Sequence, residues 1–236
     1  MTLANVIAEG VRQVRPRPAR FSPRSRLRGY HLPLMFDRKI NTQTDSQLPP
    51  FPTHTQVEGA EVTVYRIRDP VLGDAPGTFD EGVLDAPIAT PEVIMQSDCV
   101  IIGGPGRQGR MSAEVSYFFD SLTEFQTNGC LLKGKVGSAF TSVGGVGRGY
   151  GGHEAILQSF HGFFLQHGMI PVGVPPSSAM EDAHMANPFG VCMAGKPSMD
   201  KAGSRLRSLS ESEVKLAYSQ GEWASIITKQ LHDDGD

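Results

Sequence analysis

One stretch of the chain, residues 99–111, constrains the fold more than any other. It begins with the apolar run Cys99–Ile102, which is typical of a strand buried on both faces of a parallel sheet. Four glycines and a proline occupy the next seven positions, and an apolar helical pattern begins after Ser112. Strand, glycine-rich turn and helix mark the ligand-binding position of open α/β sheets. The alternative is a tight connection that binds nothing.

The same order of elements recurs along the second half of the chain. A strand is predicted over 136–142, followed by six glycines in the ten residues 143–152 and a helix over 153–167, which Gly168 ends. A strand is also expected within 57–69, which Val62, Val64 and Ile67 suit, and another over 169–174. A capping box at 210–213 opens a last helix. Alternating strands and helices predict an α/β fold, a doubly wound parallel sheet covered on both faces.

The N-terminal quarter of the chain has a different composition. Residues 1–14 show the spacing of an amphipathic helix. Residues 15–56 are rich in arginine and proline without any periodicity, and we expect a disordered insertion there. The domain itself is predicted over 57–236.

Charge and cysteine content limit the partners of the protein. The net charge of −3 argues against a nucleic-acid binder, although residues 1–58 hold nine Lys/Arg against four Asp/Glu. No apolar run reaches the length of a membrane span. Cys99, Cys130 and Cys192 follow no metal-binding spacing, which predicts free thiols in a reducing compartment, the cytoplasm.

Both glycine-rich stretches match the pattern G-x-G-x-x-G, at 104–109 and 147–152. A dinucleotide fingerprint needs an acidic residue about 20 positions further on, at the end of the next strand, and neither match has one. A flavin-free dinucleotide site is therefore the less favoured interpretation. The sequence offers neither a Ser-His-Asp pattern nor paired metal ligands, so redox or transfer chemistry would need a bound cofactor.

A series of short motifs resembles the WrbA-type flavodoxin-like NAD(P)H:quinone oxidoreductases over residues 57–231. In chain order these motifs are Thr90-Pro91-Glu92, the strand 98–102, residues 104–109 with Met111-Ser112, Phe118-Phe119-Asp120, Gly134-Lys135, Thr141-Ser142, His167-Gly168-Met169, Pro188-Phe189-Gly190 and Tyr218 with Gln220-Gly221. Residues 3–10 resemble the first helix of that family.

The resemblance implies a flavodoxin-like fold that binds FMN, uses NAD(P)H to reduce a quinone and assembles as a homotetramer or dimer. It also implies contacts with the flavin ring, and a catalytic role beside the ring for His167. The expected cofactor-binding residues are Gly104, Pro105, Gly106, Arg107, Gln108, Gly109, Ser142, Val143, Gly144, Gly145, Gly147 and His167. The loop Pro188–Gly190 is expected to help close the site.

The sequence also departs from this family. The chain starts within the expected first helix, so we expect a sheet that lacks its first strand and the phosphate-binding loop. Gly104, Gly106, Val143 and Gly145 stand where the family has hydroxyl residues, and Gln108 where it has an aromatic. The alternative function is therefore a flavodoxin-like scaffold without flavin, which binds partners or oligomerises.

Overall fold

The computed structural model describes residues 30–36, 57, 60–68, 70, 86–144, 151–176, 187–195 and 210–233. Its central sheet has the strand order β2-β1-β3-β5-β6, and two further strands join it, with β4 pairing with β3 and β7 with β5. The strands are β1 (Tyr30–Phe36), β2 (Ala60–Arg66), β3 (Cys99–Arg107), β4 (Arg110–Met111), β5 (Val136–Gly144), β6 (Ile170–Pro171) and β7 (Gly190–Gly195). All pairings are parallel except that of β3 with β4.

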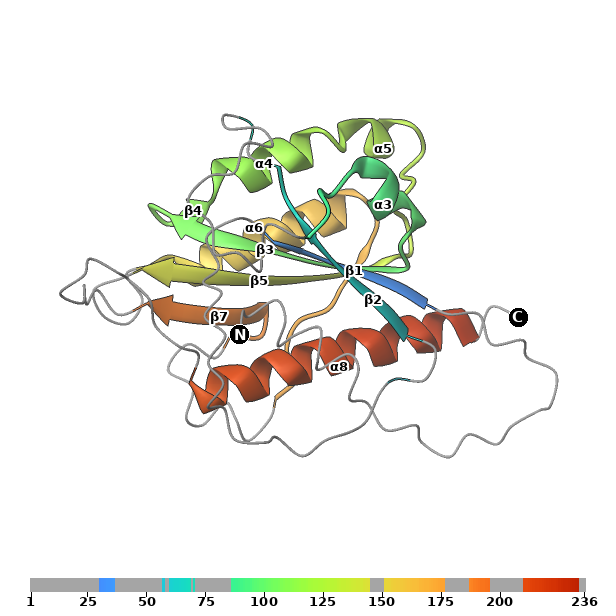
Figure 1. Ribbon diagram of the computed structural model, residues 1–236. Coiled ribbons are helices and arrows are strands. Elements are labelled where there is room, and N and C mark those ends of the chain that lie inside the picture. Colours follow the sequence, from blue (N-terminus) through green and yellow to red (C-terminus); the bar gives the residue numbers. More distant parts are fainter. Residues whose placement is uncertain are drawn as a thin grey trace.

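The helices cover both faces of the sheet, as the alternation of elements predicts (Figure 1). They are α3 (Pro91–Gln96), α4 (Ala113–Asp120), α5 (Thr123–Thr127), α6 (His153–Gln166) and α8 (Glu211–Asp233). Helix α8 packs on one face, where Cys99, Ile101 and Phe140 meet its apolar side. Helices α3, α4 and α6 pack on the other face, against Val100 and Ile102. The alternation of 99–102 between the two cores confirms that β3 is buried on both faces.

Strand β1 corrects two expectations drawn from the sequence. It lies between β2 and β3, and its residues 34–36 pair with both neighbours. The sheet therefore does not lack a strand at this position, and the expected disorder over 15–56 is wrong for Tyr30–Phe36. Parallel pairing on both sides supplies backbone partners that local composition does not reveal. The rest of 15–56, and the helix expected over 1–14, lie outside the described residues.

The strand next to β5 is divided into two short pieces. The sequence predicts one strand over 169–174 followed by a loop to 209, whereas β6 pairs with the start of β5 and β7 with its end. Gly190 fits only as glycine, because a Cβ there would lie 2.0 Å from the carbonyl oxygen of Ala139. Proximity to β5, and not a hydrophobic pattern within 175–209, decides where β7 forms.

Local signals at the helix ends are confirmed. Pro91 is the first residue of α3, and Ser112 caps α4. At the start of α8, the Ser210 backbone N–H donates to the Glu213 carboxylate at 2.8 Å, while the Glu213 N–H donates to the Ser210 hydroxyl at 3.2 Å. Such a reciprocal pair satisfies two N–H groups that the helix cannot. The helix predicted over 112–125 is divided into α4 and α5.

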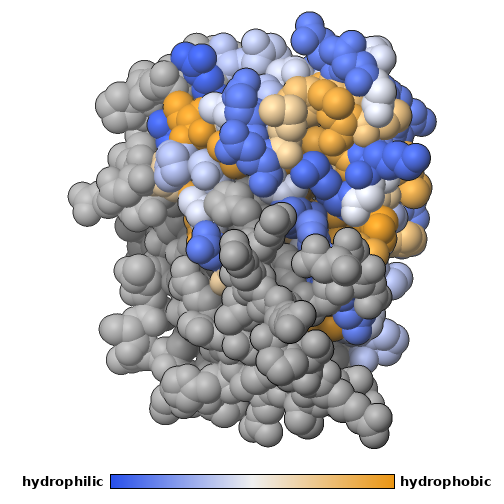
Figure 2. Space-filling view, turned by 90° about the vertical axis from the view of Figure 1, so that its right-hand side faces the viewer, coloured by the Kyte–Doolittle hydropathy of each residue, from blue (hydrophilic) through white to orange (hydrophobic). Residues whose placement is uncertain are grey.

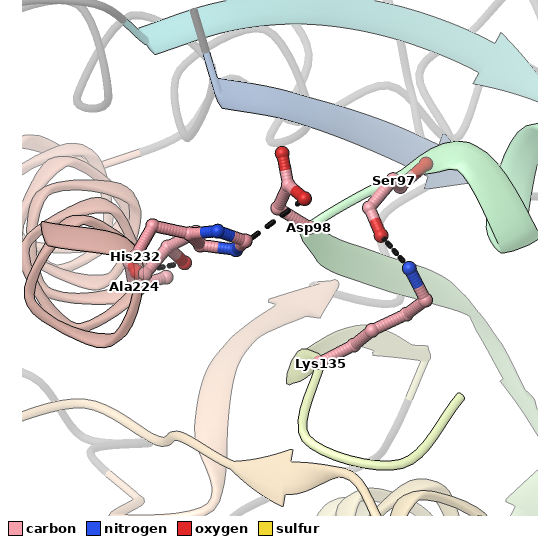
Figure 3. A network of polar contacts seen from close by, with 6 residues as sticks. Ser97, Asp98, Lys135, Ala224 and His232 are labelled. Atoms are coloured by element: carbon pink, nitrogen blue, oxygen red, sulfur yellow. Dashed lines mark hydrogen bonds and ion pairs between the residues drawn. The ribbon is translucent and has the colours of Figure 1, made fainter. Parts of the chain in front are cut away.

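A polar network fastens the end of α8 to the amino end of β3 (Figure 3). His232 Nε2 lies 3.3 Å from the Asp98 carboxylate, and Lys135 Nζ donates to the Ser97 carbonyl at 2.6 Å. The last turn of α8 is thereby held at the edge where the strands begin. Among the helices that the structure describes, none is long and apolar enough to cross a membrane.

Candidate functional site

The carboxyl ends of the parallel strands share one edge of the sheet. There β2 ends at Arg66, β3 at Arg107 and β5 at Gly144, and the arrowheads of β3, β5 and β7 lie together at the left of Figure 1. In open α/β sheets ligands bind outside this edge. Both glycine-rich stretches singled out in the sequence reach it, so the structure brings them together.

The first stretch is a hairpin and not an irregular loop. Strand β3 continues through Gly104, Pro105 and Gly106 to Arg107, which pairs with Arg110 in β4. The two residues of the turn, Gln108 and Gly109, have φ of 53° and 78°. Positive φ at both central positions is the signature of a type I′ turn, whose twist matches that of the two strands it joins. The hairpin therefore holds residues 104–109 in a defined position beyond the sheet.

The second stretch begins as strand and lies beside the first. Gly104 pairs with Thr141 and Pro105 with Ser142, and the Thr141 hydroxyl donates to the Gly104 carbonyl at 2.8 Å. Ser142 and Val143 are buried, and Gly144 is exposed at the end of β5. Gly145 and Gly147 lie outside the described residues. Apart from His167, the described residues of the predicted flavin site thus lie together, on two adjacent strand ends and the hairpin turn.

Two glycines of this region allow elements to pack together. A Cβ on Gly106 would lie 2.6 Å from Ile156 Cδ1 and 2.8 Å from Val143 Cγ1. Gly152, with φ of 65°, would bring a Cβ within 2.7 Å of the Gly109 Cα. The first contact shows that α6 packs directly on Gly106 and leaves no room for a side chain there. The second places the N-terminus of α6 against the hairpin turn.

Two buried nitrogen atoms at this edge have no hydrogen-bond partner within the described part of the chain. They are Arg66 Nε, at the end of β2, and His153 Nδ1, in the first residue of α6. A buried polar atom without a partner costs about 1–3 kcal/mol. A polar ligand bound at the edge would supply the partners. Sequence reasoning missed both residues because neither belongs to a glycine motif.

His167 lies elsewhere. It caps the C-terminus of α6, and the next residue, Gly168, accepts a hydrogen bond from the backbone N–H of Gly134, which precedes β5. Helix α6 begins beside the hairpin and has 14 residues, so His167 is separated from residues 104–109 by about 20 Å. Within one chain His167 therefore does not adjoin the hairpin, and its place beside a flavin ring stays a prediction.

The surroundings of His167 are apolar. The side chain is only 3% exposed, its ring centroid is 4.3 Å from that of Phe163, and Nδ1 has no partner among the described residues. Burial lowers the pKa of His167 below its usual value, because a charged ring is poorly solvated there. The imidazole is therefore neutral at pH 7 and has the character of a core residue.

The loop at 188–190 does not cover the edge in this chain either. Phe189 packs against the middle of α6, where its carbonyl oxygen lies 2.6 Å from His161 Nε2 and its ring centroid 5.5 Å from that of the histidine. Within one chain the loop thus lies away from the hairpin, and the expectation that Pro188–Gly190 help to close the site, at a subunit interface, stays a prediction. Desolvation lowers the pKa of His161, although its bond to Phe189 acts in the opposite direction.

The described residues provide no obvious catalytic group of their own. Burial raises the pKa of Cys99 to about 12, so its thiol stays protonated, and all three cysteines are free, as predicted. No group of three His, Cys, Asp or Glu side chains suited to a metal ion occurs in the part of the chain that the structure describes. The edge formed by the hairpin and the end of β5 is suited to binding a cofactor that carries the chemistry.

The sheet order, with β1 between β2 and β3, and the ligand edge define a flavodoxin-like α/β protein. The WrbA-like flavodoxin from Agrobacterium tumefaciens supports this fold, with a TM-score of 0.50 at 15% identity over 86% of this chain and 99% of that one. Residues 51–183 match the NADPH-dependent FMN reductase family. The chain belongs to this family.

Curated relatives agree with this assignment. A protein of Chromohalobacter salexigens named NAD(P)H dehydrogenase (quinone) is 32% identical over 182 residues, which are 74% of this chain and 85% of the relative. A protein of Methanosarcina acetivorans with the same name is 32% identical over 75% of this chain and 86% of the relative. The resemblance inferred from the motifs is thereby confirmed.

Proposed function

We propose that the protein is an FMN-dependent NAD(P)H:quinone oxidoreductase. The observation that carries this proposal is similarity at 32% identity to NAD(P)H dehydrogenases (quinone) over about three quarters of the chain. The edge formed by β3, β4 and β5 is the place in the fold where such chemistry would occur. A flavin held there would supply the hydride chemistry by which NAD(P)H reduces the quinone with two electrons.

The residues present at the edge suit a flat, polar cofactor. The backbone of Gly104–Gly109 and of Ser142–Gly144 would hold the ring, with Gly145 and Gly147 continuing the second stretch. The buried Arg66 Nε and His153 Nδ1, both without a described partner, support a ligand with hydrogen-bonding groups. The protein would bind and orient the ring and exclude water from it.

We also propose that the protein is a homo-oligomer, a dimer or a tetramer. His167 can serve a flavin ring only from a second copy, because it lies at the amino edge of its own sheet. That edge carries the exposed side chains of Met95, Leu131 and Leu231, and Figure 2 shows hydrophobic residues gathered on this side of the molecule. Light scattering on the purified protein gives the oligomeric state. The free cysteines support a cytoplasmic location.

One experiment tests the reaction. The purified chain is incubated with FMN, the unbound FMN is removed, and the visible absorption of the protein is recorded. NAD(P)H oxidation is then followed with a soluble benzoquinone. We expect a yellow protein whose NAD(P)H oxidation depends on both FMN and quinone. A colourless protein that takes up no FMN and shows no such oxidation would instead identify the flavin-free scaffold.

A further inference from the structure

Two arginines face each other across the hairpin at the ligand edge. Arg107 and Arg110 flank the two-residue turn and are directly paired in the β3–β4 register. Directly paired residues of an antiparallel ribbon place their side chains on the same face, with Cβ atoms about 5 Å apart. Like charges in this arrangement repel and destabilise the hairpin. The sequence motif contains both residues but does not show that they are neighbours.

Neither guanidinium is neutralised by a described residue. Arg110 is exposed and Arg107 partly buried, and neither has an ion pair or a side-chain hydrogen bond within the described part of the chain. Glu114, in the first turn of α4, is the acidic residue nearest in sequence, and Glu154 lies in the first turn of α6, whose N-terminus packs against the hairpin turn. Neither of these carboxylates pairs with the arginines, so two positive charges stand together without a counter-ion among the described residues.

The N-terminus of α6 adds to the positive potential. The close approach of Gly152 to Gly109 sets this terminus against the hairpin turn, and a helix N-terminus carries about half a positive charge. Two guanidiniums beside a helix N-terminus form a site for an anion with more than one negative charge.

We propose that Arg107 and Arg110 bind the 2′-phosphate of NADPH, so that the enzyme prefers NADPH to NADH. This inference rests on the proposed function, in which a nicotinamide dinucleotide is the hydride donor. A phosphate monoester carries a charge of about −1.5 to −2 at pH 7 and accepts bidentate hydrogen bonds from arginine. NADH has no such group. The backbone of the hairpin would hold the flavin ring, whereas the exposed side chain of Arg110 suits a co-substrate that leaves after each turnover.

The flavin phosphate is the other source of the same chemistry, and the test separates the two. Calorimetric titrations measure the binding of adenosine 2′,5′-bisphosphate, 5′-AMP, FMN and riboflavin to the wild type and to Arg110→Gln. We expect the bisphosphate to bind wild type at least about 10-fold more tightly than 5′-AMP. Arg110→Gln should lose most of this difference, with unchanged affinities for FMN and riboflavin.

Steady-state kinetics supply the second measurement. We expect Arg110→Gln to raise KM for NADPH about 10- to 100-fold, with kcat and the KM for NADH nearly unchanged. Arg110→Lys should recover part of the preference, because it keeps the charge but not the bidentate geometry. Lys133→Gln is the matched control, since this exposed lysine precedes β5 at the opposite edge of the sheet.

The inference would be overturned by equal binding of the bisphosphate and 5′-AMP by wild type, or by a preference that persists in Arg110→Gln. A loss of FMN affinity without a loss of riboflavin affinity would assign the pair to the flavin phosphate and overturn it as well. Quinone reduction with equal use of NADH and NADPH would leave the proposed function standing and the inference wrong. Bisphosphate binding that depends on Arg110, in a protein that reduces no quinone, would support the inference and contradict the proposed function.

Discussion

The Gln220 side chain bridges the backbones of β5 and β7 at Ala139 and Val191, where the pairing of the two strands begins. Its Oε1 accepts a hydrogen bond from the Val191 N–H at 2.9 Å, and its Nε2 donates to the Ala139 carbonyl at 2.6 Å and to the Ser138 hydroxyl at 2.8 Å. Gln220 belongs to α8 and is fully buried. One side chain thus joins the helix to both strands at the place where the neighbour of β5 is interrupted.

We expect Gln220→Leu to destabilise the protein by about 3–5 kcal/mol, because a buried N–H and a buried carbonyl lose their partner together. Urea unfolding followed by circular dichroism measures the change. Gln126→Leu is the control: this glutamine contacts Gln166 on the exposed surface and should cost under about 0.5 kcal/mol. Equal effects of the two substitutions would show that the buried network contributes little.

Gly106 is expected to matter for packing before it matters for binding. A Cβ there would press on Ile156 and Val143, so Gly106→Ala should destabilise the fold by about 1–3 kcal/mol. Ile156→Val removes the Cδ1 atom that the new Cβ would meet and should relieve part of this cost. The double variant Gly106→Ala/Ile156→Val should therefore lose less unfolding free energy than the two single variants lose in total.

Gly162→Ala provides the comparison for Gly106. Gly162 lies within α6, and a Cβ there would meet nothing within 4 Å, so alanine should stabilise the helix by about 0.5–1 kcal/mol. Thermal unfolding of Gly106→Ala, Ile156→Val, their double variant and Gly162→Ala measures these changes. Additive effects at 106 and 156 would contradict the contact.

His167 should make the protein less stable in acid. Its folded pKa lies below the unfolded value of about 6.5, so the unfolded chain binds the proton more readily than the folded one. The contribution is fully present above pH 6.5 and is lost as the pH falls towards the folded pKa. His167→Phe should therefore reduce the loss of unfolding free energy between pH 7.5 and pH 5.

The control for His167 is His167→Gln, which does not titrate but remains polar. It should share the reduced pH dependence and be less stable than His167→Phe at both pH values, because its amide would be buried beside Phe163. Denaturant titrations at the two pH values measure both effects. An unchanged pH dependence in both variants would show that His167 does not titrate differently on folding.

Hydrogen exchange should reveal β1 in solution. Residues 34–36 pair on one side with β2 and on the other with Ile101–Gly103. Their amides should exchange at least about 100-fold more slowly than an unstructured peptide, because exchange requires the sheet to open. Mass spectrometry of peptides covering 30–36 and 99–105 makes the comparison. Exchange of 30–36 at the rate of an unstructured chain would contradict its place in the sheet.

Local signals in the sequence were sufficient for much of this fold. The apolar run Cys99–Ile102 predicts a strand buried on both faces, and the Ser210–Glu213 box predicts the start of α8. Gly168, with φ of 67°, ends α6 as expected. Such features depend on backbone conformation and on neighbours within one turn or strand, so composition and spacing reveal them. The family, too, could be inferred from the order of the motifs.

The tertiary structure decided what depends on partners distant in the sequence. Pro33 and the arginine-rich surroundings of β1 argue against a strand, and only pairing with β2 and β3 creates one. Strand β7 forms because β5 and Gln220 offer partners to its backbone. Arg107 and Arg110 lie opposite each other because of the hairpin register. His167 lies at the far edge of the sheet because α6 is 14 residues long. Pairing, register and helix length place side chains in space, whereas a motif records only their order along the chain.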